Sequence, residues 1–580
     1  MPGTTYWQKQ SWRIAIRFSV NVCLAFLFAC YLLPLNASAQ IKASGPTGLT
    51  LEVNAGFHTR YRNDNWIPVQ VLARNTGSDF TGTLSIGVSN LQSVALPALY
   101  QEAIALPHGA QKEVAFSLPL YLEASGAQSL LVKLLDSSGN TVLSQVSALN
   151  AVGSQDVFVG ILSDQDSGFE MLRAISVPGQ GGSVITEPLD ASTFPSTAAL
   201  LRNFNLIVLD DFTTSSLSRS QLLALESWVN QGGALIEVGG PEWQHTLSAL
   251  PADLLPVHIN GTSMLPPKTS LVPIDGPGTQ PAIPTPGMKV PQTFPPQGIV
   301  LTVTVSTATI TNGGAGGQPQ GIAPTGLASQ AETILSAGDI PLLVQAHHGQ
   351  GIVCYLAFDP TLEPLVSWAG TSMLWKALLI RGLGDQLFTT SADARFGTSG
   401  SAMIGMLQTL LPNALVSPWV LALLLLVYLL VLGPGRSYIM QRYGGKDARR
   451  RMDWSWRIVL ISIVVFSLLT YGLALNQKGR AIVSSSISVI QLNEGSASAH
   501  VTTYLSIFVP NQGDFSVHLP GNTVVQPLPN NFLQGDITFS GQTTTITSDS
   551  DGTDIHLRGV DIWTLRTILA EQDRQIHGGI

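Results

Sequence analysis

Two long apolar runs constrain this chain more than any other feature of its sequence. Residues 415–433 and residues 458–475 contain no Asp, Glu, Lys, Arg or His, and each run is long enough to cross a lipid bilayer as a helix. We therefore expect transmembrane helices over residues 415–434 and 457–475, with the lipid bilayer as their partner. Ion and proton pathways use ionisable side chains inside the membrane, so the composition of both runs argues against a transport path.

The short segment between the two runs is strongly basic. It carries seven Lys and Arg residues between positions 436 and 457, which are opposed by Asp447 and Asp453. Segments rich in Lys and Arg stay on the cytoplasmic side of a membrane, so we expect residues 435–456 to form a cytoplasmic loop. Binding of anionic lipid or of a cytoplasmic partner would also suit this charge, although control of topology accounts for it alone.

The N-terminus has the order of a secretory signal. Three basic residues precede the uncharged residues 18–33, and the small residues Ala37, Ser38 and Ala39 follow. A basic region, an apolar core and a small-residue cleavage site predict a signal peptide over residues 1–39, with an uncleaved anchor as the alternative. In either case the following residues are exported, which predicts a cell-membrane protein with most of its chain extracytoplasmic.

The overall composition limits the classes of partner and site. Charged residues make up 11% of the chain, the mean hydropathy is +0.27, and the net charge is −8. Nucleic-acid binding usually requires a basic face, so we expect no nucleic-acid partner. Cys354 is the only Cys outside the N-terminal apolar segment, which predicts neither an internal disulfide in the exported part nor a metal site of Cys/His spacing.

Two stretches have the alternating apolar pattern of β-strands. In residues 47–150 such strands are separated by turn signals, for example Asn75-Thr76-Gly77, and this pattern predicts an exported β-sandwich. Residues 484–580 are rich in Ser and Thr and alternate in the same way, which predicts a C-terminal exported β domain. No closing strand is evident before Ile580, which suggests that this domain is incomplete.

Residues 203–241 contain a strand, an acidic turn, a helix, a Gly-Gly turn and a second strand. The first strand, residues 206–209, is an unbroken apolar run, and residues 234–238 form the second. Strands covered on both faces and joined by a helix predict a parallel sheet with a right-handed crossover. Ligands bind such sheets at the carboxyl ends of the strands, so this edge is the first place to expect a site.

The same pattern extends over residues 155–390, which we expect to form one α/β domain with a Pro/Gly-rich insertion at residues 255–335. Several carboxylates follow its predicted strands, and because the carboxyl ends of parallel strands share one edge they could meet there and hold Mg²⁺ or Ca²⁺. Asp is also common as a helix cap and in turns, which is the alternative explanation. The candidate metal ligands are Asp164, Asp166, Asp210 and Asp211, with Asp359 at a further strand end.

Four segments of this domain resemble the class I glutamine-amidotransferase-like fold, in the version fused to membrane segments in bacterial exported proteins. They read VFVGILSD at residues 157–164, NLIVLDDF at 205–212, LESWVNQGGALIEVGGP at 225–241 and HGQGIVCYLAFDP at 348–360. The resemblance implies a flavodoxin-like, amidotransferase-like parallel α/β domain. Together with the other segments, it makes the chain a multidomain protein of α/β and all-β parts with a two-helix transmembrane hairpin.

In that family a catalytic Cys lies at a sharp turn after the strand that matches residues 234–238. Here the turn holds Gly239 and Gly240, so the nucleophile turn is degenerate, and the family's His-x-Glu pair has no match near His347 or His348. Cys354 lies in the middle of a predicted strand, where a thiol behaves as a small buried hydrophobe. We therefore predict no catalytic residue and no cofactor.

Three functions remain open from the sequence. The first is a non-enzymatic, membrane-anchored extracytoplasmic binding or scaffold protein that binds an unknown protein or ligand outside the cytoplasm. The second is a metal-dependent hydrolase that uses the acidic strand edge, although a fold alone does not imply a reaction. The third is an accessory subunit of an envelope or transport complex.

Overall fold

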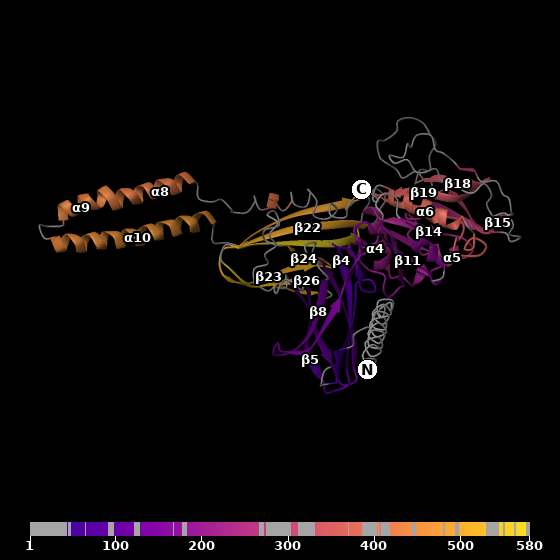
Figure 1. The fold of residues 1–580 in the computed structure, drawn as a ribbon, viewed down its shortest axis with the longest axis horizontal. Helices are drawn as coiled ribbons and strands as arrows, with labels where there is room; N and C mark the ends of the chain where they lie inside the picture. The colour runs from indigo at the N-terminus through magenta and orange to yellow at the C-terminus, as the bar shows by residue number, and fades with distance from the viewer. Residues whose placement is uncertain are drawn as a thin grey trace, which may run out of the picture. The chain divides into compact units, whose positions relative to one another are not determined.

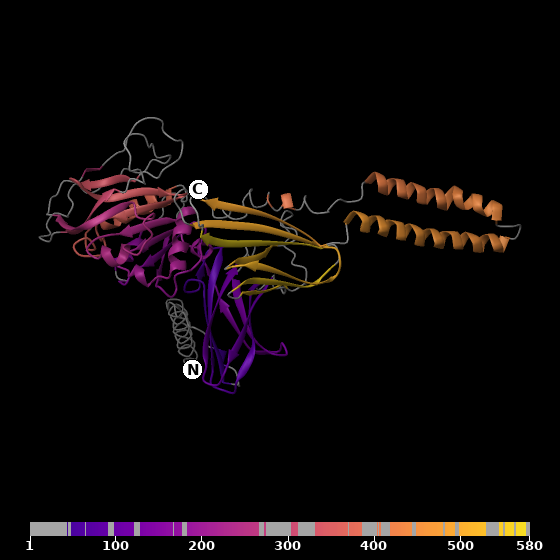
Figure 2. The same cartoon turned by 180° about the vertical axis from the view of Figure 1, so that it is seen from behind.

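The computed structural model of the chain is mostly β-sheet (Figures 1 and 2). The predicted signal peptide lies outside the part that it describes. The described residues are 43–44, 48–63, 65–90, 98–120, 128–165, 168–176, 182–265, 272–273, 303–310, 331–368, 370–384, 403, 405–407, 418–443, 448–478, 482–492, 498–521, 523–528, 544–548, 551–561 and 564–575.

The N-terminal strands belong mainly to two sheets. Residues in strand β2 alternate between buried and half-buried positions, because successive side chains of a strand point to opposite faces. The first sheet has the order β1-β2-β4-β7, formed by Ala43–Ser44, Leu49–Ala55, Trp66–Asn75 and Gln111–Pro119. The second sheet includes β5 (Phe80–Asn90), β6 (Leu99–Leu106), β8 (Gln128–Asp136) and β9 (Thr141–Ala148), while β3 (Arg60–Tyr61) and β10 (Asn150–Ala151) form a separate short pair.

The C-terminal strands complete the second sheet and form a third. Strand β25 pairs with β6 in parallel, with Ile546 opposite Tyr100, and Figure 1 shows the C-terminal strands beside the N-terminal ones. The second sheet therefore has the order β23-β26-β25-β6-β5-β8-β9, with β23 at Gly513–Pro520, β25 at Thr544–Ser548 and β26 at Gly552–Val560. The third has the order β21-β22-β27-β24, formed by Val483–Leu492, Ser498–Val509, Thr564–Gln575 and Val524–Leu528.

One hydrophobic core joins these three sheets, which we call the β body. It contains Leu84 and Ile86 from the N-terminal part together with Ile507 and Ile555 from the C-terminal part. The expectation of separate domains at residues 47–150 and 484–580 therefore needs correction, because strands of both share a sheet and a core. Residues 564–575 form strand β27 near the end of the described chain.

A mixed eight-stranded sheet with flanking helices forms the α/β region. Its order is β12-β11-β13-β14-β20-β19-β18-β16, and the first five strands are parallel. These strands are β12 (Val184–Leu189), β11 (Val157–Leu162), β13 (Leu206–Leu209), β14 (Ala234–Val238) and β20 (Gly351–Leu356). The antiparallel strands are β19 (Ile340–His348), β18 (Glu332–Ala337) and β16 (Val272–Pro273). The helices are α2 (Glu170–Arg173), α3 (Ala198–Leu201), α4 (Arg219–Asn230), α5 (Trp243–Leu247) and α6 (Thr371–Leu383). A short 3₁₀ turn, η2, lies at Thr214–Ser216.

The predicted parallel pairing around α4 is confirmed. Leu206 to Leu209 of β13 pair with Ala234 to Glu237 of β14, and every residue of both strands is buried. Ser218 starts α4 with a reciprocal capping box, in which its hydroxyl accepts from the N–H of Gln221 and the Gln221 side chain accepts from the N–H of Ser218. Such a cap satisfies backbone donors that the first helical turn leaves unpaired.

The insertion contributes a second small sheet. Strand β15 (Val257–Leu265) pairs antiparallel with β17 (Val303–Ile310). The sequence pattern did not indicate β15, because this strand interrupts its apolar residues with His258, Asn260 and Gly261.

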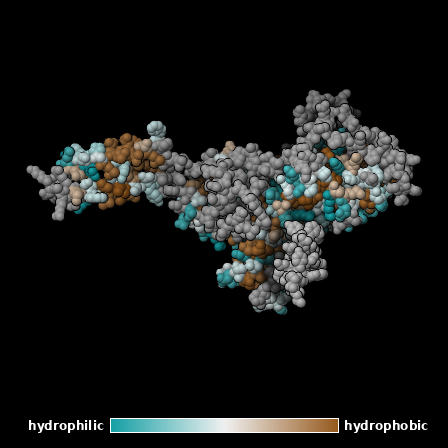
Figure 3. Space-filling view, viewed as in Figure 1, coloured by the Kyte–Doolittle hydropathy of each residue, from teal (hydrophilic) through white to brown (hydrophobic). Residues whose placement is uncertain are grey.

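Two described helices are long and apolar enough to cross a membrane. These candidate spans are Trp419–Arg442 and Trp454–Leu473, and they comprise α8 (Pro418–Leu430), the π-helical turn η5 (Val431–Gly435), α9 (Arg436–Tyr443) and α10 (Ala448–Lys478). Figure 3 shows hydrophobic residues gathered on this helical part. Helix α9 and the start of α10 occupy most of the expected loop at residues 435–456, because Arg, Ala and Met are good helix formers and continue both helices beyond their apolar runs.

Candidate functional site

The acidic residues predicted at strand ends lie at the carboxyl edge of the parallel strands. Asp164 follows β11, Asp210 and Asp211 follow β13, and Asp359 follows β20. The N–H of Asp164 donates to the carbonyl oxygen of Asp211 at 3.1 Å, so the β11 and β13 ends are joined directly. Asp166, the remaining candidate, lies outside the described residues.

Asp210 and Asp359 are linked through the hydroxyl group of Thr361. The Thr361 Oγ1 atom lies 3.1 Å from Oδ2 of Asp210 and 2.6 Å from Oδ1 of Asp359. Both carboxyl groups are buried, with 1% and 7% of each residue exposed. Burial raises the pKa of Asp210 well above its usual range, and the negative charge of Asp359 raises it further. Burial also raises the pKa of Asp359, against the hydrogen bonds that Thr361 donates to it.

Thr361 binds the two carboxyl groups unequally. Its hydroxyl group has one hydrogen to donate, and the shorter of its two contacts is the one with Asp359. Asp359 Oδ1 also accepts the backbone N–H of Thr361 at 2.7 Å, which favours its ionised form. Asp359 is therefore better supplied with hydrogen bonds than Asp210, whose Oδ1 has no partner among the described residues.

Asp211 is held on the more open side of the edge. Its Oδ1 lies 2.9 Å from Nε2 of His245 on α5, and its Oδ2 accepts from the amide of Gln165 at 2.8 Å. The backbone of Asp211 has a φ of 45°, a left-handed conformation that Asp and Asn adopt more readily than most residues. This turn points Asp210 and Asp211 to different partners.

A metal site at this edge has little structural support. Among the described residues, no group of three or more His, Cys, Asp or Glu side chains could hold a metal ion. Burial raises the pKa of both Asp210 and Asp359, whereas metal ligands must be deprotonated.

The degenerate nucleophile turn is closed by its neighbours. A Cβ atom built on Gly239 would lie 2.3 Å from Oγ of Ser306 and 3.0 Å from the carbonyl oxygen of Leu356. Ser306 belongs to β17 of the insertion, and its hydroxyl hydrogen-bonds with that of Tyr355 on β20. Gly240 has a φ of 72° and lies against Asp359. The sequence did not predict this closure, since nothing in its pattern places residue 306 over residue 239.

Glu237, two residues before this turn, is fully buried. Neither of its carboxylate oxygens has a hydrogen-bond partner among the described residues, and burial raises its pKa well above the usual range. Glu237 is paired with Leu209 and Tyr355 in the sheet, and side chains alternate along a strand. It therefore lies on the sheet face opposite to Asp210 and is separate from the acidic pair.

The remaining candidate nucleophile is inert in this structure. Cys354 is buried in β20, paired with Ile236 of β14, and burial raises the pKa of its thiol to about 12. Nucleophilic cysteines have a lowered pKa and access to solvent. His347 and His348 end strand β19 and lie opposite Ile352 and Gly351 at the β19–β20 turn, away from the carboxyl edge of the sheet.

A loop of the β body makes one polar contact with the α/β region. Glu187 of β12, which is 1% exposed, pairs with His58 and with Arg60, whose guanidinium lies 3.3 Å away. Arg62 donates its backbone N–H to the side chain of Asn203 at 2.9 Å. The sequence did not predict this contact, because a run of charged residues carries no information on a distant partner.

A second polar contact, which we call the Arg202 network, joins α3 and α4 to the third sheet. Arg202 forms an ion pair with Glu571 at 2.8 Å and contacts Nε2 of His500 at 2.8 Å. Asp573 accepts from the backbone N–H of Ala198 at 3.0 Å and from the hydroxyl of Ser227 at 2.8 Å.

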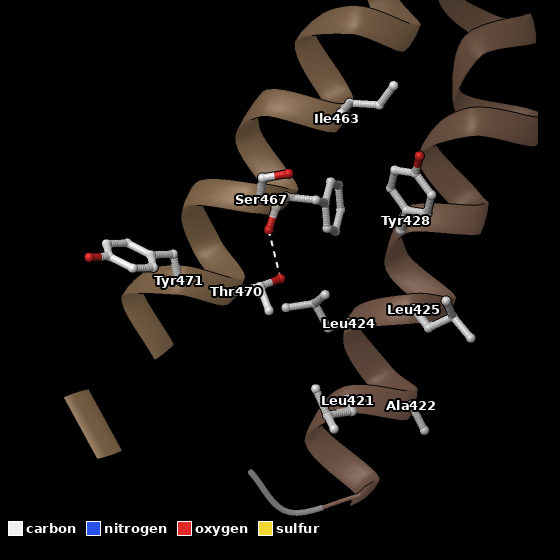
Figure 4. Close-up of a pocket in the computed structure, with 10 residues that line it drawn as sticks. Leu421, Ala422, Leu424, Leu425, Tyr428, Ile463, Ser467, Thr470 and Tyr471 are labelled. Carbon is white, nitrogen blue, oxygen red and sulfur yellow. Dashed lines mark hydrogen bonds between the residues drawn. The ribbon is translucent and has the colours of Figure 1, made fainter. Parts of the chain in front are cut away.

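A groove runs between the two membrane-type helices. Its volume is about 850 Å³, and ten residues of α8 and α10 line it, including Leu425, Tyr428, Ser467 and Thr470 (Figure 4). The Thr470 hydroxyl donates to the carbonyl oxygen of Phe466 at 2.7 Å, and the rings of Tyr428 and Phe466 meet edge to face with centroids 5.0 Å apart. The groove lining is thus mostly apolar, and its threonine hydroxyl is hydrogen-bonded inside the helix.

Comparison with known proteins adds one family match. Residues 48–150 match the model of a family described as a domain of unknown function (DUF8726), which covers the N-terminal strands of the β body. No curated protein is similar to the chain.

Several solved structures share limited similarity with parts of the chain. The cytoplasmic protein STM1381 from Salmonella typhimurium LT2 is 16% identical over 39% of this chain and 98% of its own, with a TM-score of 0.27. The cytoplasmic protein STM3548 from Salmonella typhimurium is 16% identical over the same shares, with a TM-score of 0.26. The CARDB domain of the PF1109 protein from Pyrococcus furiosus, in complex with di-metal ions, is 13% identical over 20% of this chain and 97% of its own, with a TM-score of 0.15. Similarity at this level supports no conclusion about the chain.

Proposed function

We propose that the chain is a non-enzymatic, membrane-anchored extracytoplasmic scaffold or binding protein. Its α/β region would be a degenerate glutamine-amidotransferase-like domain of flavodoxin-like type. The observation that carries this proposal is the closed turn at Gly239, where Ser306 of the insertion occupies the space that a nucleophile side chain would need.

The parallel strands support the family resemblance. Four segments quoted for it contribute β11, β13, β14 and β20, which are neighbours in the sheet. The only thiol in them, that of Cys354, is buried with a raised pKa. An amidotransferase-like scaffold that lacks its chemistry is the simplest account of both observations.

The shared core of the β body supports the proposed topology. Strands before and after the helical hairpin pair with each other, so both parts must lie on one side of any membrane. A chain meets this condition when it crosses the membrane twice between them, as α8 and α10 would. The basic residues at the hairpin turn then favour a cytoplasmic turn and an extracytoplasmic β body.

Labelling of single cysteines in intact cells tests this topology. We expect Ser144→Cys, on the exposed edge of β9, to react with a membrane-impermeant maleimide. Met452→Cys, exposed on α10 near the hairpin turn, should react only after the membrane is permeabilised. The reverse pattern would overturn the orientation.

Two assays of the full chain in lipid nanodiscs test the absence of amidotransferase chemistry. We expect no ammonia release from glutamine and no modification of Cys354 by a glutamine-analogue alkylating agent. Glutamine hydrolysis that disappears in Cys354→Ala would show that the domain is an enzyme. Photocrosslinking from exposed positions in native membranes tests the scaffold role, and recovery of no crosslinked partner from any of them would count against it.

A metal-dependent hydrolase at the acidic edge is the second function that the sequence allows. Binding of a metal to the folded protein must raise its melting temperature. We expect millimolar Mg²⁺ or Ca²⁺ to leave the melting temperature of the full chain unchanged, because burial raises the pKa of Asp210 and opposes the ionised form that a metal ion needs. An increase that is lost in Asp210→Asn would favour the hydrolase instead.

A further inference from the structure

Strand β21 forms a free edge of the third sheet. It stands at the end of the order β21-β22-β27-β24, so no described strand pairs with its outer side. Its side chains alternate between half-buried and exposed positions over most of its length, and the exposed fractions of Ile482, Ile490 and Leu492 are 52%, 57% and 45%. An edge strand with free backbone groups and exposed apolar side chains is a ready site for pairing with another strand.

The other sheet edges in the described part of the chain carry features that oppose such pairing. Proteins protect edges with charged side chains, Pro residues, β-bulges or very short strands. The protecting features are the charges and Pro119 of β7, Asp514 and Pro520 of β23, Pro527 of β24, Glu187 and Pro188 of β12, the two-residue lengths of β1, β3, β10 and β16, and the register shifts beside β9 and within the β15–β17 pair. Strand β21 has none of them: its ten residues, VSSSISVIQL, are uncharged and contain no Pro, and its ladder with β22 has no register shift.

The sequence around β21 is nearly symmetric about Ser486. Residues 482–490 read IVSSSISVI, so that only positions 485 and 487 break the symmetry. Two strands that pair antiparallel about Ser486 bring like residues together, namely Ile482 with Ile490, Val483 with Val489, and Ser484 with Ser488. Pairs of β-branched residues and pairs of hydroxyl residues stabilise antiparallel ladders. An unrelated partner strand would not need this symmetry, whereas a second copy of β21 uses it at nearly every pair.

We propose that β21 is the interface through which two copies of this chain associate. The two β21 strands pair antiparallel, which joins the third sheets of both copies into one continuous sheet with a two-fold axis at Ser486. Both copies thereby use the same surface, as in closed two-fold dimers. The lack of charge on β21 suits this arrangement, because a charged side chain near the axis would lie opposite the same charge on the second copy.

The interface is compatible with insertion of both copies in one membrane. Helix α10 ends at Lys478 and β21 begins at Val483, so the end of each hairpin lies within about 17 Å of the start of its strand. With Val483 opposite Val489 of the second copy, the two strand starts lie about 20 Å apart along the ladder. A two-fold axis perpendicular to the membrane gives both copies the same orientation, with β21 parallel to the membrane surface. The pairing does not depend on the proposed scaffold role, because it uses no residue of the α/β region.

Cysteine crosslinking of the full chain in the membranes of expressing cells tests the register. Cys23 and Cys30 are replaced by Ala, and the buried Cys354 is kept. Ser486→Cys, at the axis, should form a covalent dimer with a short bis-methanethiosulfonate reagent. Ser484→Cys alone should not, because its two copies would lie about 14 Å apart, but it should crosslink to Ser488→Cys when both variants are expressed together.

Two results of this experiment would overturn the proposal. The first is a Ser484→Cys variant that crosslinks to itself as well as Ser486→Cys does. The second is a Ser486→Cys variant that stays monomeric. In that case, protection of its thiol from a reagent with a single reactive group would show that a different polypeptide covers the edge.

A charge at the axis tests the same interface without a crosslink. Two differently tagged copies of the chain are expressed together, and the share of one that co-purifies with the other in mild detergent is measured. Ser486→Lys should lower this share at least about tenfold, because two like charges would lie directly opposite each other. Ser486→Glu should do the same, whereas a Ser486→Lys copy and a Ser486→Glu copy should associate with each other.

The association of the mixed pair also shows that each variant folds. Ser144→Lys, a matched change at an exposed position on the β9 edge, should leave the association of two copies unchanged. Association that survives Ser486→Lys, or that does not return in the mixed pair, would overturn the proposal.

Discussion

Glu237 provides a test of how this fold tolerates a buried acid. Both of its carboxylate oxygens lack hydrogen-bond partners among the described residues, and the residue is fully buried in β14. A buried polar group without a partner costs about 1–3 kcal/mol of stability. Met is apolar and similar in size to Glu. We therefore predict that Glu237→Met raises the free energy of opening around β14 by about 1–3 kcal/mol at pH 5.

The pH dependence of this effect has a definite sign. The pKa of Glu237 is raised in the folded protein, chiefly by burial, whereas an unfolded Glu ionises near pH 4.3. The ionisation of Glu237 thus leaves stability unchanged below about pH 4.3, and stability falls as the pH rises towards the folded-state pKa, by up to about 1.4 kcal/mol for each pH unit. Glu237→Gln keeps the shape but cannot ionise, so it should match the wild type near pH 4 and exceed it increasingly at higher pH.

Native-state hydrogen exchange of peptides that span β14, with added urea, measures the free energy of opening in this part of the chain. The full chain in nanodiscs is compared at several pH values between 4 and 8, after correction for intrinsic exchange. Glu170→Gln is the matched control, because the Glu170 side chain is 72% exposed on α2. Parallel curves for the wild type and Glu237→Gln, or a destabilised Glu237→Met, would show that Glu237 is neither a buried acid nor unpartnered in solution.

Three further predictions follow from other contacts. Gly239→Ala should lower the free energy of unfolding by about 1–3 kcal/mol through overpacking against Ser306, part of which Ser306→Gly should restore in a thermal melt; an unchanged melting temperature would argue for an open turn. Asp573→Asn should weaken the contact between the α/β region and the third sheet at neutral pH, and it should reduce the loss of stability that acid causes. A carboxyl group with a lowered pKa stabilises the fold above its unfolded pKa and loses that effect as the pH falls through its folded pKa. A melting temperature that depends on pH in the same way as that of the wild type would contradict this. A fragment that ends at residue 410 should leave β6 without β25 and be cleaved rapidly by protease, whereas a protease-resistant fragment would show that the N-terminal strands fold alone.

Local periodicity predicted the parts of this structure that short segments determine. The apolar run at residues 206–209, the capping residue Ser218 and the Gly-Gly turn at 232–233 are enough to specify β13, α4 and β14, because each signal acts on residues close in sequence. The apolar runs likewise located α8 and α10. The polar ends of these helices were missed, since a hydropathy pattern detects the membrane-facing part of a helix and not its full length.

Contacts between distant residues were beyond the same reasoning. The pairing of Ile546 with Tyr100 and the closure of Gly239 by Ser306 depend on where loops of many residues return, which no periodic signal records. The acidic edge was anticipated because strand order brings Asp210 and Asp359 together. The hydroxyl group that links them was not, because nothing in the sequence pattern places Thr361 between the two carboxyl groups.

The order of strands along the chain sets a condition on folding. Strand β25 pairs with β6, and Ile507, Ile555 and Ile568 fill the core that the N-terminal strands begin. On the proposed topology, the residues that complete this core are exported only after the hairpin has entered the membrane. Until then, the N-terminal strands must leave part of their apolar surface exposed. The chain entropy lost on closing a long loop must also be overcome before β25 and β6 can pair. Membrane insertion of α8 and α10 thereby becomes a step in folding the β body as well as its anchor.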